Sequence, residues 1–103
     1  MKFTVYQINM DRDKARVKFQ CYERTLQEVP EIRMEIYDKV YEGEIQRQEE
    51  ETEKTLEAIY GELNLRKDRH PKFKGHSLSV SDVVELKGER WFCDTVGWKK
   101  LGS

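Results

Sequence analysis

Residues 78–94 have the sequence LSVSDVVELKGERWFCD, and this stretch decides the fold class. Two runs rich in β-branched and aromatic residues, 78–86 and 90–94, lie on either side of Lys87-Gly88. This pattern is typical of two antiparallel strands joined by a tight turn. The sequence therefore predicts a β-hairpin in the C-terminal third of the chain, followed by a short tail.

The clearest helix is predicted upstream of this hairpin, near residues 49–63. Leu56, Ile59, Tyr60 and Leu63 recur at steps of three and four residues, so they fall on one face of a helix. Glutamates crowd the first turns, where the helix dipole favours negative charge. We expect the apolar face of this helix to pack against the sheet.

The N-terminal half contains further elements of less uniform pattern. Apolar residues alternate with others over residues 2–8, which predicts a strand. Residues 14–28 show both a helical and an alternating period, and we favour a helix there. Residues 31–41 form a short amphipathic stretch that Gly43 closes.

The length of 103 residues fits one domain. Charged residues make up 38% of the chain, above the usual value of about 25%, so we expect a lean core and a heavily charged surface. Together with the predicted elements, this indicates one α+β domain over residues 1–103. A small antiparallel sheet would pack against two or three helices.

The net charge of −1 conceals an acidic block followed by a basic block. Residues 42–64 hold eight acidic and two basic side chains, and residues 65–74 hold five basic and one acidic. Separated charge of this kind bears on partners more than on fold.

The glutamates of the predicted helix have two interpretations. They are either a solvated helix face or a surface that copies the phosphate array of DNA. Helix residues rise about 1.5 Å each and duplex DNA carries one charge per ~1.7 Å, so the charge densities are comparable. The candidate partner-binding residues are Glu49, Glu50, Glu51, Glu53 and Glu57.

The basic block supports a different hypothesis, in which a loop contacts phosphates or stacked bases. Its candidate nucleic-acid-binding residues are Arg66, Lys67, Arg69, Lys72 and Lys74.

Five residues near the predicted hairpin supply every side-chain type of a hydrolytic triad: His76, Ser77, Ser79, Ser81 and Asp82. They lie within one turn and one strand, however, and a triad needs groups that converge in space. We therefore expect no catalytic residue here. The serine and aspartate side chains should instead bond backbone groups and set up a turn.

Metal, disulfide and targeting signals are weak. His70 and His76 lack zinc-site spacing, and we expect Cys21 and Cys93 to be reduced thiols, with Cys93 packed in a strand. We predict no metal and no cofactor. We see no signal peptide at the N-terminus and no apolar run of the ~20 residues that span a bilayer, so we expect a cytoplasmic protein.

Residues 70–98 resemble the YodL-like family, most specifically in the string GHSLSVSDVV over residues 75–84. Trp91-Phe-Cys-Asp94 and Gly97-Trp98 add to the resemblance, and it extends with lower specificity to three upstream segments: Phe3–Ile8, Tyr37–Gly43 and Leu56–Asn64. The resemblance implies an accessory protein of bacterial mobile elements without an established enzymatic activity.

Two functional hypotheses follow from the resemblance and the charge pattern. The first is a monomeric anti-CRISPR protein that inhibits a Cas9-type nuclease by stoichiometric protein binding, with the acidic helix at the contact. The second is a conjugation or plasmid accessory protein that binds nucleic acid through residues 66–74.

Overall fold

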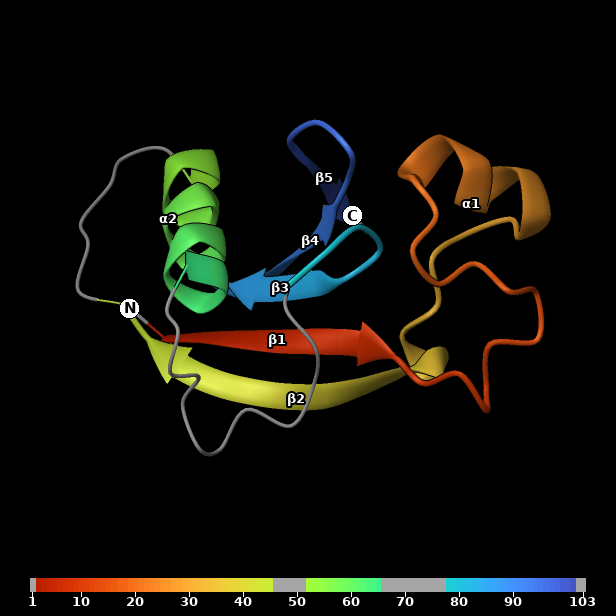
Figure 1. The fold of residues 1–103 in the computed structure, drawn as a ribbon, viewed down its shortest axis with the longest axis horizontal. Coiled ribbons are helices and arrows are strands. Elements are labelled where there is room, and N and C mark those ends of the chain that lie inside the picture. The colour runs from red at the N-terminus through yellow and green to blue at the C-terminus, as the bar shows by residue number, and fades with distance from the viewer. Residues whose placement is uncertain (1, 46–51, 66–77, 102–103) are drawn as a thin grey trace.

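A computed structural model describes residues 2–45, 52–65 and 78–101 (Figure 1). Five strands form one sheet in the order β2-β1-β3-β4-β5, with every neighbouring pair antiparallel. The strands are β1 Lys2–Ile8, β2 Tyr37–Glu44, β3 Val83–Leu86, β4 Glu89–Cys93 and β5 Trp98–Leu101. The helices are α1 Tyr22–Glu28, the short 3-10 helix Met34–Ile36 and α2 Thr52–Leu65. The α+β prediction is confirmed.

Each face of the sheet carries its own apolar cluster. Adjacent Val83 and Val84 fall in different clusters because successive strand side chains point to opposite faces. One cluster lies under α2, and its buried members are Phe3, Val5, Ile45, Leu56, Ile59, Leu78, Val84, Leu86, Cys93 and Trp98. The other contains Ile8, Val17, Tyr37, Val83 and Phe92. The two longer helices lie toward opposite ends of the molecule (Figure 1).

The predicted helix near 49–63 is observed as α2, and it packs as expected. Leu56 and Ile59 are fully buried, and Leu63 is half-buried against the same cluster. Tyr60 is 36% exposed, but its ring meets Trp98 edge-on with centroids 6.5 Å apart. The first three predicted residues, 49–51, lie outside the described residues.

The helix prediction for residues 14–28 is correct only in its second half, because α1 begins at Tyr22. The Asp13 carboxylate accepts hydrogen bonds from the backbone N–H groups of Val17 and Lys18, each at 2.9 Å. Arg16 and Phe19 have φ values of 56° and 69°, which a right-handed helix does not allow. The side chain of Asp13 thus competes successfully with helix formation.

Two edge strands were not predicted. β2 lies in the stretch treated as merely amphipathic, and the register shifts between Val5 and Tyr6, where Val40 is an extra residue on β2. Such a bulge moves side chains to the other face and breaks the alternation that marks a strand. β5 was expected to be a tail. Its two adjacent lysines interrupt the alternation of apolar and polar residues that would have indicated a strand paired with β4.

The hairpin prediction is confirmed, but its first strand is shorter than expected. Lys87 and Gly88 both have positive φ, 54° and 77°, as a two-residue hairpin turn requires. β3 begins only at Val83 because Ser81 has a φ of 82° and the Asp82 N–H bonds the Ser79 carbonyl at 3.1 Å. Residues 78–82 therefore form a turn rather than a strand.

Candidate acidic interface and the Ser-Asp turn

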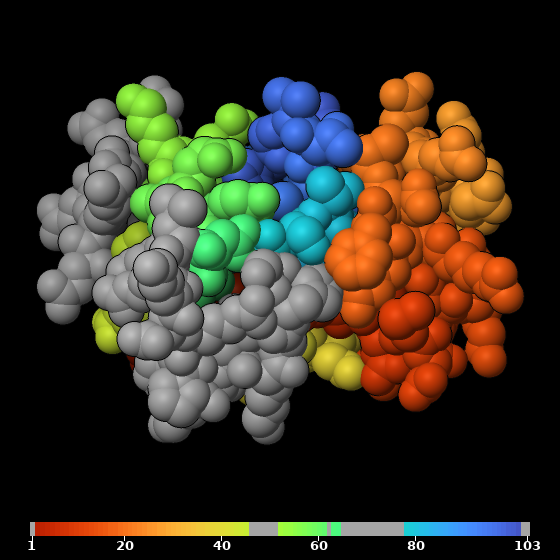
Figure 2. All heavy atoms as spheres, in the orientation of Figure 1, coloured from red at the N-terminus to blue at the C-terminus, as the bar shows by residue number. Residues whose placement is uncertain are grey.

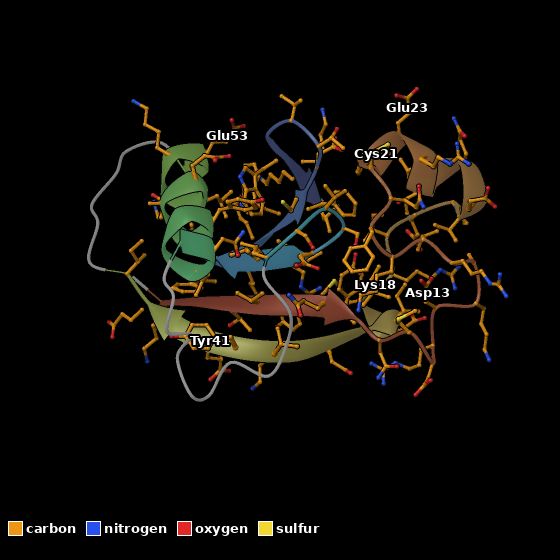
Figure 3. The ribbon with its side chains drawn as sticks, viewed as in Figure 1. Asp13, Lys18, Cys21, Glu23, Tyr41 and Glu53 are labelled. Carbon is orange, nitrogen blue, oxygen red and sulfur yellow. The ribbon has the colours of Figure 1, made fainter. Side chains whose placement is uncertain are left out.

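Two of the five candidate partner-binding glutamates lie in the described residues, and they differ in environment. Glu53 is exposed in the first turn of α2 (Figure 3). Glu57, one turn later, is exposed but accepts a hydrogen bond of 2.9 Å from Trp98 Nε1. Glu57 thus also fixes α2 to β5. Glu49, Glu50 and Glu51 lie outside the described residues, directly before the first residue of α2.

Sequence reasoning missed the acidic residues that the fold brings to the same side of the molecule. Figure 3 shows Glu53 on α2 and Glu23 on α1 toward the same side of the molecule, at its opposite ends. Figure 2 shows three elements side by side along one edge of the molecule: the start of α2, then the β4–β5 turn, then α1. Asp94 lies in that turn. Glu23 and Glu53 are far apart in the chain, so no sequence pattern signals that they share this edge.

Asp94 connects the turn to α1. Its Oδ1 accepts a hydrogen bond of 3.1 Å from the backbone N–H of Tyr22 and one of 2.8 Å from Thr95. No side-chain cap comes from Cys21, the residue that precedes α1. A residue from a distant turn therefore satisfies the first N–H of the helix and fixes the two elements together.

The edge is not purely acidic in the described residues. Lys54 and Arg24 are exposed on the same two helices. In the sequence, residues 42–64 hold the eight acidic and two basic side chains noted above.

The turn of residues 78–82, called the Ser-Asp turn below, contains a buried network of hydrogen bonds around Ser81 and Asp82. The Asp82 carboxylate accepts bonds of 2.8 Å from the Ser79 N–H and 3.0 Å from Gln7 Nε2. Burial raises the pKa of Asp82 to about 7, although the bonds from Ser79 and Gln7 and the charge of Lys18 oppose the shift. Gln7 is on β1, so Asp82 connects the turn to the centre of the sheet.

Ser81, fully buried beside Asp82, fixes two further segments. Its Oγ accepts a hydrogen bond of 2.9 Å from the Phe19 N–H, and its carbonyl accepts one of 2.6 Å from the Tyr37 hydroxyl. Burial raises the pKa of Tyr37, so this phenol stays protonated and keeps donating. The prediction that these side chains bond backbone groups is confirmed for Ser81 and Asp82.

The other candidate chemical groups are placed as follows. Cys93 is buried in β4, as predicted, and burial raises the pKa of its thiol to about 12. Cys21 is half-buried, and the two cysteines form no disulfide. Within the described ranges, no three acidic, histidine or cysteine residues are grouped so that they could hold a metal ion. His70, His76 and Ser77 lie outside those ranges.

The basic candidates Arg66, Lys67, Arg69, Lys72 and Lys74 also lie outside the described residues. The residues on either side of that segment do contact each other. Asn64, near the end of α2, forms two hydrogen bonds with the backbone of Leu78, each of 2.7 Å. Asn64 is the penultimate residue of α2, which ends at Leu65.

A family model described as the YodL-like domain matches residues 2–103. The chain belongs to the YodL-like family. The match includes every described helix and strand, together with the Ser-Asp turn. Comparison with curated proteins and with solved structures gave no match. No helix among the described residues is long and apolar enough to cross a membrane.

Proposed function

We propose that this YodL-like protein is a non-catalytic inhibitor that a mobile element uses against host defence. Its target would be a Cas9-type RNA-guided nuclease, which it would block by stoichiometric binding. The observation that supports the proposal most is the exposed acidic start of α2. There Glu53 is preceded in the sequence by Thr52 and three further glutamates, and it shares one side of the molecule with Glu23 (Figure 3).

Electrostatics supplies the mechanism. A nuclease of this class holds its nucleic acids in a positively charged channel. Carboxylates at the start of α2 would be attracted to that channel and would orient the inhibitor during association. Because exposed charges contribute more to association rate and specificity than to affinity, apolar contacts must supply much of the binding free energy.

Exposed apolar side chains are present on the same elements. Tyr60 is half-packed on Trp98 and keeps 36% of its surface exposed. Val96, at the tip of the β4–β5 turn, is 86% exposed. The hydrogen bond between Glu57 and Trp98 holds α2 against this part of the sheet, so the side chains are presented by a rigid support. Glu57 would thus contribute mainly by positioning.

A DNA-cleavage assay with a Cas9–guide complex tests this mechanism. Changing Glu49, Glu50, Glu51 and Glu53 together to Lys should relieve inhibition. The matched control changes four exposed acidic residues elsewhere, which are Asp11, Glu28, Glu31 and Glu35. It alters the net charge equally and should still inhibit. If both variants inhibit as the wild type does, the nuclease remains the target but the acidic mechanism is wrong.

The second candidate function, nucleic-acid binding by a conjugation or plasmid accessory protein, is favoured by one contact. The bonds between Asn64 and Leu78 join the two ends of the segment that holds the five basic residues. A gel-shift assay with single- and double-stranded DNA at two salt concentrations tests it. Phosphate contacts would weaken steeply with salt, and the absence of a shift at both concentrations would exclude this function.

A further inference from the structure

A groove of about 440 Å³ crosses the sheet on the face opposite α2. Its apolar lining comes from Ile32 and Met34, which precede β2, and from Leu101 of β5. The charged residues around it are Glu85, Glu89, Arg90 and Lys100. A concave surface with an apolar floor and a charged rim is suited to hold one apolar side chain of a partner.

The groove lies against an edge of the sheet. β5 is the last strand in the sheet order, and β4 is its neighbour on one side. Among the described residues no strand pairs with its other side, so that side presents backbone N–H and C=O groups as a template for another strand. Leu101 belongs to both the strand and the groove, which makes the two features continuous.

Charge at this edge is positive. Arg90 forms an ion pair of 3.8 Å with Glu85, and Lys100 pairs with Glu89. Lys87, in the β3–β4 turn, and Lys99, on β5, are exposed and make no ion pair with a described residue. The edge therefore has two positive charges in excess of its acidic groups.

These charges discriminate between possible strands. If β5 paired antiparallel with β5 of a second copy, Lys99 would stand opposite Lys100 twice, and like charges directly opposite are destabilising. Lys99 and Lys100 point to opposite faces, so an extended segment with carboxylates at adjacent positions would instead place one against each lysine. Lysines on an edge strand thus disfavour self-association and favour an acidic partner.

We infer that the edge of β5 and the adjoining groove bind an acidic, extended segment of a partner protein by strand addition. Backbone hydrogen bonds to β5 would supply affinity, and one apolar side chain two positions from an acidic residue would enter the groove. This surface is distinct from the acidic start of α2. The inference does not depend on the proposed function, and either one can fail alone.

Selection from a phage-displayed library of random peptides on the immobilised full chain tests the inference. Enriched peptides should carry two adjacent acidic residues, one of them two positions from an apolar residue. A synthetic peptide of the enriched sequence should slow amide exchange of residues 99–101. The same peptide methylated on alternate backbone nitrogens should not bind, because strand addition requires those N–H groups.

Two matched charge reversals locate the binding site. Lys99→Glu should lower the affinity for the peptide about tenfold. Lys14→Glu changes an exposed loop residue outside the groove and should leave that affinity unchanged. Lys99→Gln, which only neutralises the charge, should have a smaller effect and guards against a folding defect in the reversal. The inference is wrong if no peptide is enriched, if the peptides lack acidic residues, or if they bind the Lys99→Glu variant unchanged.

Discussion

Asn64 and Leu78 are fixed to each other by a pair of hydrogen bonds, although thirteen residues separate them in the chain. The Asn64 amide donates to the Leu78 carbonyl and accepts from the Leu78 N–H, with both distances at 2.7 Å. The side chain thereby acts on Leu78 as a neighbouring strand would. The contact fixes the end of α2 to the start of the Ser-Asp turn, and it joins the ends of the basic segment.

Asn64→Ala should lower the free energy of unfolding by about 1–3 kcal/mol, because it leaves two backbone groups of Leu78, itself 1% exposed, without these partners. Urea unfolding measures the change. Gln27→Ala, on an exposed position of α1, is the control and should be close to neutral. An Asn64→Ala variant as stable as the wild type would show that the contact is dispensable.

Leu56→Ala should destabilise the protein by roughly 2–5 kcal/mol, because it removes a fully buried side chain that joins α2 to the sheet. Thermal unfolding followed by circular dichroism checks this result. Leu26→Ala, on α1, truncates the same residue type where it is 37% exposed and should cost much less. Equal effects of the two substitutions would refute the packing described for α2.

Gly43 lies opposite Phe3 in the β1–β2 pair, and a Cβ at this position would lie 2.6 Å from ring atoms of both Phe3 and Tyr41. Gly43→Ala should therefore cost about 1–3 kcal/mol, because the rings must move. In a Phe3→Leu background the same substitution should cost less. A double-mutant cycle by urea unfolding measures the difference, and additive effects would show that the ring is not the obstacle.

Stability should depend on the protonation of Asp82. Burial raises its pKa from 3.8 to about 7, so the folded state binds a proton more tightly than the unfolded state. Wherever the folded state holds more protons, stability decreases as pH rises. The contribution of Asp82 is therefore fully present below about pH 4 and is lost as pH rises through about 7.

Asp82→Asn isolates this effect, since the other titrating groups are common to both proteins. Relative to the variant, the wild type should lose stability progressively as pH rises from about 4 to about 7. Urea unfolding over this range gives the difference in free energy of unfolding. Parallel curves, or a difference that changes in the opposite direction, would contradict the raised pKa.

The features predicted correctly from sequence are those that local patterns specify. The apolar face of α2 and the Lys87-Gly88 turn each depend on residues a few positions apart. β2 was missed because its bulge at Val40 disrupts the alternation, and the loop before α1 was missed because the Asp13 side chain bonds the backbone that a helix would use. Both depend on structure that single-sequence periodicity does not encode.

The candidate site was predicted in composition but not in arrangement. The acidic block was visible, but the bond between Glu57 and Trp98 joins residues 41 positions apart. The placement of Glu23 on the same edge of the molecule as the start of α2 likewise depends on where the fold puts α1 (Figure 3). Such contacts arise from the tertiary fold, so local spacing gave no indication of them.

The proposed function requires stoichiometric binding to a nuclease rather than catalysis. The most direct measurement is the rate of DNA cleavage by a fixed amount of Cas9–guide complex, titrated with wild-type protein. On the proposed function, the cleavage rate should fall in proportion to the protein added and reach its minimum near the equimolar point. No inhibition at any ratio would contradict the proposed partner. Full inhibition by a small fraction of the equimolar amount would contradict stoichiometric binding, because it requires turnover.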